Sequence, residues 1–363
     1  MDQSTVPRGH FFLPGPTEVR PEILAAQNHQ MIGHRGEAIR ALMATIQVGL
    51  KEVFLTKRPV VVSTSSATGL MEAGLRNGVA GGRVLSLVNG AFSERFAEIS
   101  VGCGFATDLW EIEWGTAHDT DELARRLEDQ RYDAITLSQS ETSTGALQDL
   151  ARIAEIAAEH PETMLLVDSV TGVGGAEVRT DDWMLDFVVT GSQKALALPP
   201  GLAFGVASEA MMSRSEQATA KGFYFDLIPL HESLAKNETP ATPAVSLMYA
   251  LRDQLAHLSA EGIENRWDRH TRMRDRTIEW AESRHDRGMG VFAVEGRRSP
   301  TVTCINVPDG STGSGIASEL LARGWVVGAG YGKLKDLTIR IGHMGDHTME
   351  ELELLLDAID GVM

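Results

Sequence analysis

The feature that most constrains the fold is an alternation of short apolar runs with segments of helical periodicity. The apolar runs have the length of buried strands and occupy residues 60–64, 83–90, 105–112, 133–140, 164–170, 186–192 and 202–208. Strands that alternate with helices favour a mostly parallel sheet with helices on both faces. The sequence therefore predicts an α/β fold. Ligands of such sheets bind outside the carboxyl ends of the strands.

The pattern changes near residue 246, where a long helical stretch precedes short strands and a last helix. A chain of 363 residues is too long for one compact core. We therefore expect an extended N-terminal segment (1–20), a large domain (21–245) and a small C-terminal domain (246–363).

Charge and cysteine content exclude several classes of partner. A net charge of −17 disfavours binding to nucleic acid or to an anionic membrane, because both are polyanions. No run approaches the ~18 apolar residues that span a bilayer, and the N-terminus lacks the apolar core of a signal peptide. The two cysteines, Cys103 and Cys304, form no metal or redox motif. We expect a cytoplasmic protein without a metal site.

A lysine follows directly after one of the apolar runs. In DFVVTGSQKALALPPG (186–201), small polar residues end the strand, Lys194 comes next, and a Pro-Pro-Gly turn follows. Desolvation at such a position lowers the pKa of an amine and makes it a nucleophile. Taken alone, the pattern also fits a surface lysine in a turn.

An aspartate ends another apolar run, MLLVDSV (164–170). A buried carboxylate at Asp168 is costly unless it has a cationic partner. A protonated pyridine nitrogen would be such a partner, and its charge would let the ring of a cofactor accept electrons. The alternative is that Asp168 caps the following turn or helix.

Two further strand ends carry residues that fit a phosphorylated, planar ligand. After 60–64, a small polar turn leads into a helix whose first backbone amides, with the hydroxyls of Ser66 and Thr68, could hold a phosphate. Phe92 follows the run 83–90 and could stack on a planar ring. An ordinary helix N-cap and a core phenylalanine are the alternatives.

Polar groups also stand at 138–145 and 337–345. The hydroxyl-rich stretch SQSETSTG contains Glu141 and Thr142, which fit either a cofactor contact or a plain loop. Arg340 lies within the apolar run LTIRIGHMG, where a guanidinium needs an acceptor such as a carboxylate. A clamp on a substrate α-carboxylate and a structural ion pair both satisfy that need.

Taken together and in order, these segments resemble the class V pyridoxal-phosphate (PLP)-dependent aminotransferases, most of all the alanine–glyoxylate and serine–pyruvate aminotransferases. The resemblance runs through nearly the whole chain, in LPGPTEV, STSSATGLMEA, NGAFSERF, SETSTG, VDSV, GSQKALALPPG, TPAVSL and IRIGHMG. It implies fold type I, with a mostly parallel seven-stranded sheet in the large domain and a smaller α+β C-terminal domain. It also implies a homodimer with active sites near the subunit interface.

The resemblance assigns roles to residues. Lys194 resembles the lysine that holds PLP as a Schiff base, and Asp168 resembles the partner of the pyridine nitrogen. Arg340 resembles the arginine that binds the substrate carboxylate, while Phe92 and Val170 would pack on opposite faces of the ring. The other residues implied to bind the cofactor are Ser66, Ala67, Thr68 and Gln193 at the phosphate, and Thr142 near the ring hydroxyl.

This chain departs from relatives at some of these positions. Many relatives have glycine in the turn 64–67, which here is Thr-Ser-Ser-Ala, and many have tryptophan in place of Phe92. In some relatives a tyrosine and a threonine reach the phosphate of the neighbouring subunit. Glu238 and Ala241 stand there in this chain, so the resemblance does not carry that contact over.

The function implied is a ping-pong transfer of an amino group from a small amino acid, such as alanine or serine, to a 2-oxo acid such as glyoxylate or pyruvate. Lys194 would move the proton from the donor Cα, Asp168 would keep the ring nitrogen protonated, and Arg340 would hold the donor carboxylate. An aspartate or aminoethylphosphonate-type donor also fits the motifs.

Two other functions stay open. Cysteine desulfurases and lyases share the fold, but they usually stack a histidine on the ring and need a mobile cysteine. This chain has Phe92, and Cys304 lies in a strand-like run. The second is a non-catalytic protein of the same fold, against which the intact Lys194 and Asp168 argue. The His-Arg pair at 34–35 fits a substrate contact or an exposed helix start.

Overall fold

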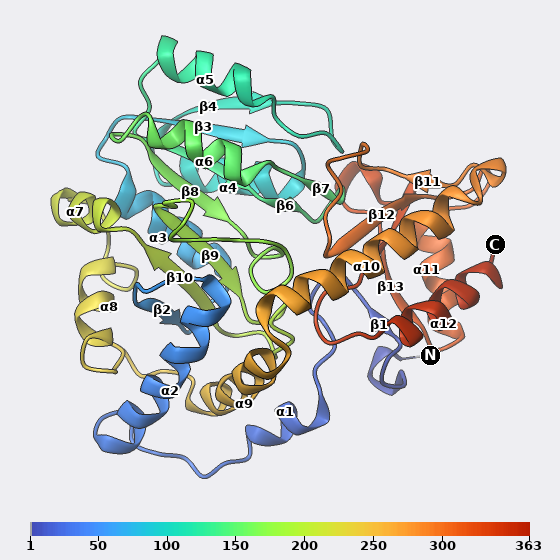
Figure 1. Ribbon diagram of the computed structural model, residues 1–363, viewed down its shortest axis with the longest axis horizontal. Helices are drawn as coiled ribbons and strands as arrows, with labels where there is room; N and C mark the ends of the chain where they lie inside the picture. Colours follow the sequence, from blue (N-terminus) through green and yellow to red (C-terminus); the bar gives the residue numbers. More distant parts are fainter. Residues whose placement is uncertain (1) are drawn as a thin grey trace.

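A seven-stranded sheet forms the centre of the larger part of the molecule in the computed structural model, which describes residues 2–363 (Figure 1). Its strand order is β2, β10, β9, β8, β5, β3, β4. β10 runs antiparallel to β2 and β9, and the other neighbours are parallel. This confirms the mostly parallel α/β sheet that the alternating pattern predicts.

Each strand of this sheet lies within one of the apolar runs. The bounds are β2 Val60–Ser63, β3 Arg83–Val88, β4 Ala106–Glu111, β5 Ala134–Ser138, β8 Met164–Asp168, β9 Phe187–Gly191 and β10 Ala203–Ala207. Every residue of β5, β8, β9 and β10 is buried, which explains why their sequences are mostly apolar. β4 forms an edge and carries exposed residues.

Helices cover this sheet and link its strands. Their bounds are α1 Pro21–Ala26, α2 Glu37–Phe54, α3 Ala67–Gly78, α4 Ala91–Gly102, α5 Thr120–Asp129, α6 Leu150–Ala158, α7 Glu209–Gln217, α8 Leu227–Leu234 and α9 Val245–Glu261. α3 packs against β8, β9 and β10, and α4 against β3, β4 and β5. Both helices begin at the carboxyl end of a strand, so their first turns lie where a ligand is expected.

The smaller part is built on a five-stranded sheet with the order β1, β13, β14, β12, β11. The strands are β1 Phe11–Phe12, β11 Gly290–Val291, β12 Val302–Asn306, β13 Val326–Ala329 and β14 Thr338–Gly342, and the helices are α10 Ile263–Glu282, α11 Gly313–Ala322 and α12 Met349–Asp360. β1 pairs in parallel with β13, so the N-terminal segment is an edge strand of the C-terminal sheet. A two-stranded ribbon, β6 Ser140–Glu141 and β7 Ala146–Leu147, lies near the junction of the two parts.

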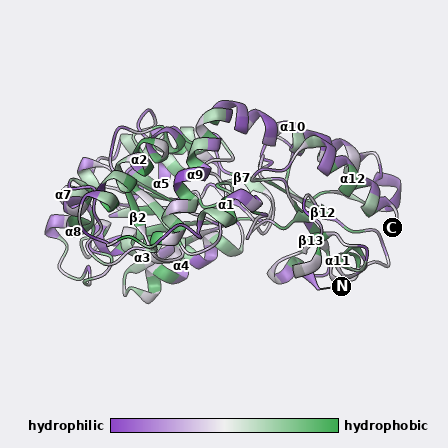
Figure 2. Cartoon of the chain, turned by 90° about the horizontal axis from the view of Figure 1, so that it is seen from below, coloured by the Kyte–Doolittle hydropathy of each residue, from purple (hydrophilic) through white to green (hydrophobic). Residues whose placement is uncertain are grey.

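The long helical stretch expected from residue 246 is divided into two helices by Gly262. This glycine has a φ of 80°, a left-handed conformation that other residues adopt only with strain. α9 packs on α1 and α2, whereas α10 packs on β11, β12 and α12. Figure 2 shows α10 as a mainly hydrophilic helix that runs along the outside between the two parts. The domain boundary near residue 246 stays a prediction.

Each part has its own apolar core. One cluster surrounds the seven-stranded sheet, and a second lies under the five-stranded sheet and includes Phe12, Trp280, Leu320 and Leu355. Phe12 is fully buried in the second cluster, so the N-terminal strand contributes to the core of the smaller part. Within residues 2–363, no helix combines the length and the apolar character needed to cross a bilayer.

Candidate active site

Lys194 lies just beyond β9 with a desolvated amine. The residue is 9% exposed, and its Nζ donates a hydrogen bond to the carbonyl oxygen of Pro14. Burial lowers the pKa of the Lys194 amine to about 8, and the positive charge of Arg340 acts in the same direction. Near neutral pH, this amine is therefore unprotonated far more often than an ordinary lysine amine, as a nucleophile requires.

The N-terminal segment closes over this lysine. Thr17 donates its backbone N–H to the carbonyl of Gln193 and its hydroxyl to the carbonyl of Lys194, both at 3.0 Å. Gly15 has a φ of 105°, and a Cβ at this position would overlap the Lys194 side chain. Sequence reasoning missed this contact, because the two segments are 180 residues apart.

Asp168 ends β8, the strand next to β9. Its carboxylate accepts hydrogen bonds from Ser138 Oγ at 2.8 Å and from the backbone N–H of Val170 at 2.9 Å. The residue is 5% exposed, and burial raises the pKa of this carboxyl to about 6 despite both donors. A cationic partner would stabilise the ionised form, because it would replace the hydration that burial removes.

The start of α3 forms another wall of the site. Ser66 is the N-cap residue, and its side chain makes no capping hydrogen bond. The positive end of the helix dipole and the first backbone N–H groups are therefore available to an anion such as a phosphate.

One cavity of about 90 Å³ brings these groups together. All nine residues expected to bind the cofactor line it: Ser66, Ala67, Thr68, Phe92, Thr142, Asp168, Val170, Gln193 and Lys194. An amine, a buried carboxylate and an uncapped helix start match the aldehyde, the ring nitrogen and the phosphate of PLP, so the residues present fit this cofactor.

Arg340 does not line this cavity directly but contacts its wall. It lies on β14, where its Nε donates to the carbonyl of Ala329 at 3.0 Å and its Nη1 to the carbonyl of Thr142 at 3.3 Å. Burial lowers the pKa of the guanidinium. In the described part of the chain, no carboxylate lies within the 4.0 Å of an ion pair with Arg340, so a structural ion pair is not its role here.

Two residues that sequence reasoning did not single out, Arg95 and Tyr331, line or border the cavity. Arg95 lies one turn after Phe92, and its guanidinium carbon is 4.9 Å from the centre of the Phe92 ring. Tyr331, from the smaller part, packs 5.2 Å from the same ring and accepts a hydrogen bond from Arg95 Nη2 at 3.1 Å. The spacing of three residues on one helix face was the available signal for Arg95.

Glu141, which the sequence places in a stretch that fits either a cofactor contact or a plain loop, fixes the start of α4. Its carboxylate accepts hydrogen bonds from the backbone N–H groups of Phe92 and Ser93 and from the N–H and hydroxyl of Ser143. A Cβ at Gly90 would collide with this side chain, so glycine is needed there. Glu141 is fully buried and acts as an N-terminal cap of α4 through these hydrogen bonds. The cap also sets the position of the Phe92 ring.

Glu141→Gln is expected to lower the free energy of unfolding by about 1–3 kcal/mol, since the amide nitrogen would face N–H donors and leave at least one unsatisfied. Urea unfolding of the variant and of wild type measures this difference. Glu159→Gln, on an exposed side chain, is the matched control and should change stability by less than about 0.5 kcal/mol. Equal stabilities of the Glu141 variant and wild type would contradict the capping role.

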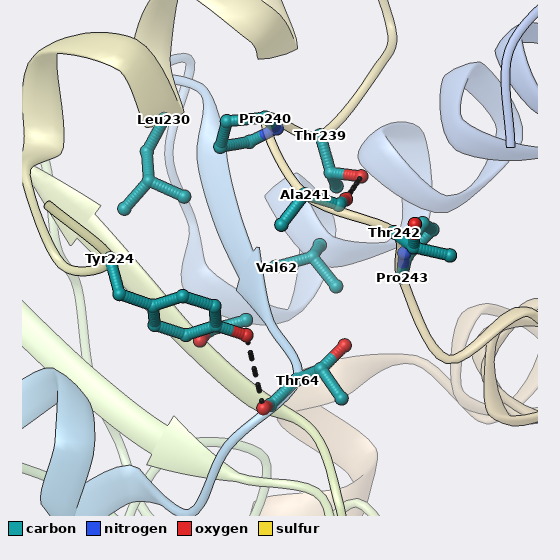
Figure 3. A pocket seen from close by; sticks show the side chains of 10 residues that line it. Val62, Thr64, Tyr224, Leu230, Thr239, Pro240, Ala241, Thr242 and Pro243 are labelled. Carbon is teal, nitrogen blue, oxygen red and sulfur yellow. Dashed lines mark hydrogen bonds between the residues drawn. The ribbon is translucent and has the colours of Figure 1, made fainter.

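A second pocket lies behind the turn that precedes α3 (Figure 3). Tyr224 donates its hydroxyl to the carbonyl of Thr64, and Thr239 donates to the carbonyl of Ala241 at 2.7 Å. Glu238, which stands where some relatives have an intersubunit phosphate ligand, instead forms a 2.8 Å ion pair with Arg40 of its own chain.

Neither His34, Arg35 nor either cysteine lines the cavity around Lys194. Arg35 is exposed and donates to the carbonyl of Pro240 at 3.1 Å. Cys304 is fully buried in β12, and burial raises the pKa of its thiol to about 11. Burial also raises the pKa of Cys103. Neither thiol is activated as the nucleophile that a cysteine desulfurase needs.

Comparisons with known proteins agree with this geometry. Residues 21–354 match the family described as aminotransferase class-V. An uncharacterized aminotransferase of Methanocaldococcus jannaschii is 37% identical over 92% of this chain and 87% of that protein. The L-aspartate–glyoxylate aminotransferase of Paracoccus denitrificans is 32% identical over 93% of this chain and 87% of that protein. The crystal structure of an alanine–glyoxylate aminotransferase from Nostoc sp. matches with a TM-score of 0.91 at 31% identity, covering 100% of this chain and 97% of that one.

Proposed function

The chain belongs to the class V aminotransferases, which are PLP-dependent transaminases, and we propose that Lys194, Asp168 and Arg340 carry its reaction. The enzyme transfers an amino group from a small amino acid to a 2-oxo acid of the glyoxylate type, as the names of its relatives support. The observation that carries the proposal is that the desolvated amine of Lys194 shares one cavity with the buried carboxylate of Asp168 and the start of α3.

Lys194 has two tasks in this proposal. When bound, PLP supplies an aldehyde that takes up the amino group and a ring that delocalises the electron pair left on the donor Cα. Lys194 supplies the amine that tethers the cofactor as a Schiff base. With the donor in the site, Nζ would accept the proton from the donor Cα and would hold it for return on the cofactor side of the transferred amino group.

Asp168 and the cavity walls hold the cofactor in place. Asp168 supplies the negative charge that keeps a ring nitrogen protonated, and Ser138 and Val170 orient its two oxygens. The start of α3 offers uncapped N–H groups to the phosphate. Phe92, positioned by the Glu141 cap, and Val170 both line the cavity and would pack against the ring.

The experiment that tests the function is a steady-state assay with alanine, serine or aspartate as donor and glyoxylate or pyruvate as acceptor. Because the amino group stays on the enzyme between the two half-reactions, double-reciprocal plots should give parallel lines, the pattern of a ping-pong mechanism. The donor alone should release about one equivalent of keto acid per active site. If no donor gives amino transfer to either acceptor, the proposed function is wrong.

Arg340→Ala should weaken the reaction of an amino acid far more than that of the matching amine. A charge-assisted hydrogen bond to the α-carboxylate contributes about 1.5–3 kcal/mol, so kcat/KM for alanine should fall roughly 10- to 100-fold. Ethylamine has no carboxylate and should lose much less. Arg323→Ala, on the exposed end of α11, is the control. Equal losses for alanine and ethylamine would show that Arg340 has a structural role only.

We propose a homodimer as the working form. Phe223 is 96% exposed and Tyr224 is 48% exposed beside the pocket of Figure 3, an apolar surface that a second copy would cover. Light scattering should give twice the chain mass, and Phe223→Asp should reduce it toward that of a monomer. A monomeric wild-type protein would contradict the proposal. The cytoplasmic location stays a prediction.

A further inference from the structure

The active site has more cationic groups than the reaction of a simple amino acid uses. Lys194, Arg95 and Arg340 supply positive charge, whereas Asp168 and Glu141 supply negative charge. Under the proposed function, Lys194 tethers the cofactor, Asp168 faces its ring nitrogen, and Glu141 caps α4. Arg340 then binds the α-carboxylate of the donor. Among these groups, no anionic partner is left for Arg95.

Arg95 is held in place but is not neutralised. Its side chain is half-buried and lines the cavity that contains Lys194. Within residues 2–363, no carboxylate lies within the 4.0 Å of an ion pair with Arg95, although Glu94 and Glu98 are its neighbours on α4. Its partners are the Tyr331 hydroxyl at 3.1 Å and the Phe92 ring at 4.9 Å. A guanidinium that is fixed by a hydroxyl and a ring keeps N–H groups free for a carboxylate, which it can bind in a bidentate manner.

The contacts of Arg95 place it on the side of the substrate rather than on the side of the cofactor phosphate. Tyr331, its hydrogen-bond partner, comes from the smaller part, and the ring of Tyr331 is 5.5 Å from the guanidinium carbon of Arg340. Tyr331 therefore contacts both guanidinium groups. The phosphate cradle, in contrast, is the start of α3 at Ser66.

An open cleft leads from this point to the solvent. Arg95 lines both the cofactor cavity and this outer cleft of about 570 Å³, whose lining also includes Tyr331, Trp114, Lys333, Glu94, Glu98 and Glu111. Lys333 Nζ lies 4.2 Å from the Trp114 ring. Arg95 is the residue that this cleft and the cavity of Lys194 share, so its guanidinium can meet the far end of a donor side chain that extends from the cavity toward the cleft.

We propose that Arg95, held by Tyr331, binds a second carboxylate at the end of the donor side chain, so that the site selects a dicarboxylic amino acid of the aspartate type. This inference rests on the proposed function, because it concerns the donor of the same reaction. Arg340 holds the α-carboxylate and Arg95 the distal one, with Tyr331 between them. Arg95 is thus a specificity-determining residue.

The test compares donors in the first half-reaction of the PLP-loaded enzyme. Wild type should react with aspartate roughly 10- to 100-fold more efficiently than with asparagine, because asparagine has the same shape without the charge. In Arg95→Gln, the loss of kcat/KM for aspartate should be at least tenfold larger than the loss for alanine. Arg125→Gln removes the same charge from an exposed position on α5 and should leave the ratio of aspartate to alanine unchanged.

A binding measurement provides a readout that does not depend on turnover. Titration calorimetry should show that succinate binds wild type at least tenfold more tightly than propionate does, and that Arg95→Gln removes this preference. Tyr331→Phe, which removes the hydroxyl but keeps the ring, should lower the preference part of the way. The phenylalanine variant also keeps the proposal testable if Arg95→Gln does not fold.

Each outcome bears on a different claim. If alanine reacts but aspartate is no better than asparagine and succinate is no better than propionate, the Arg95 proposal is overturned while the transaminase function stands. If Arg95→Gln weakens binding of PLP to the cofactor-free protein more than tenfold, Arg95 is a phosphate ligand and the proposal is also overturned. If no donor reacts at all, it is the proposed function that fails.

Discussion

Lys194→Ala is expected to abolish transamination. The variant loses the amine that tethers the cofactor and the base that moves the Cα proton, and a general base alone contributes roughly 10²- to 10⁴-fold to a rate. We therefore expect kcat to fall at least about 10³-fold in an assay with alanine and glyoxylate. Lys335→Ala, on an exposed lysine, should keep wild-type turnover.

Chemical labelling tests whether Lys194 tethers the cofactor, without a rate measurement. Borohydride reduction of the PLP-loaded wild type should fix the cofactor to a single peptide that contains Lys194, and Lys194→Ala should leave no labelled peptide. Since burial lowers the pKa of this amine to about 8, capture of the aldehyde by the cofactor-free protein should accelerate as pH rises through about 8, not 10.5. A label on another lysine, or full turnover of the alanine variant, would end the assignment.

Asp168→Asn is expected to give the second-largest loss. The amide has nearly the same shape but no charge, so it cannot hold a ring nitrogen in its protonated form. Loss of a charge-assisted pair costs about 1.5–3 kcal/mol, which corresponds to roughly 10- to 100-fold weaker cofactor binding. The half-reaction with alanine should slow as well, because the carbanion is less delocalised. Asp168→Glu keeps the charge and should retain more activity than Asp168→Asn. Unchanged rates in the asparagine variant would remove the role given to Asp168.

The raised pKa of Asp168 should also make the stability of the cofactor-free protein depend on pH. The pKa of Asp168 is raised from 3.8 to about 6 by burial, so the folded state binds the proton more tightly than the unfolded chain does. Protonated Asp168 therefore stabilises the folded wild type below pH 4. This stabilisation, up to about 3 kcal/mol, is lost as pH rises through 6. Asp168→Asn is neutral throughout. Relative to wild type, the variant should gain stability between pH 4 and pH 7, and a constant difference would contradict the raised pKa.

The large sheet was predictable because its central strands are buried on both faces. Burial on both faces requires continuous apolar runs, and such runs bounded by polar residues are visible without a structure. Asp168 and Lys194 were predictable for a related reason, since β8 and β9 are adjacent and parallel and therefore bring the residues after them to one edge of the sheet. The resemblance to a family then named their roles.

The rest depends on tertiary contacts that leave no local pattern. Arg95 and Glu141 act through groups on other elements, and a helix arginine or a loop glutamate has the same sequence signal whether or not it meets a cavity. Tyr331 reaches the site from the other sheet. The break at Gly262 was missed because a single glycine costs a helix only about 1 kcal/mol, so periodicity alone does not distinguish a break from a continuous helix.

The pairing of β1 with β13 has a consequence for how the enzyme is made. Phe11 and Phe12 are synthesised long before their partners Val326 and Val327. The carbonyl of Pro14 that receives the Lys194 amine follows directly after this strand. A nascent chain thus has its seven-stranded sheet available long before its lysine is covered. A chain that stops before β13 would lack the strand that holds this segment over Lys194, so the desolvation that lowers the pKa of its amine depends on completion of the smaller part.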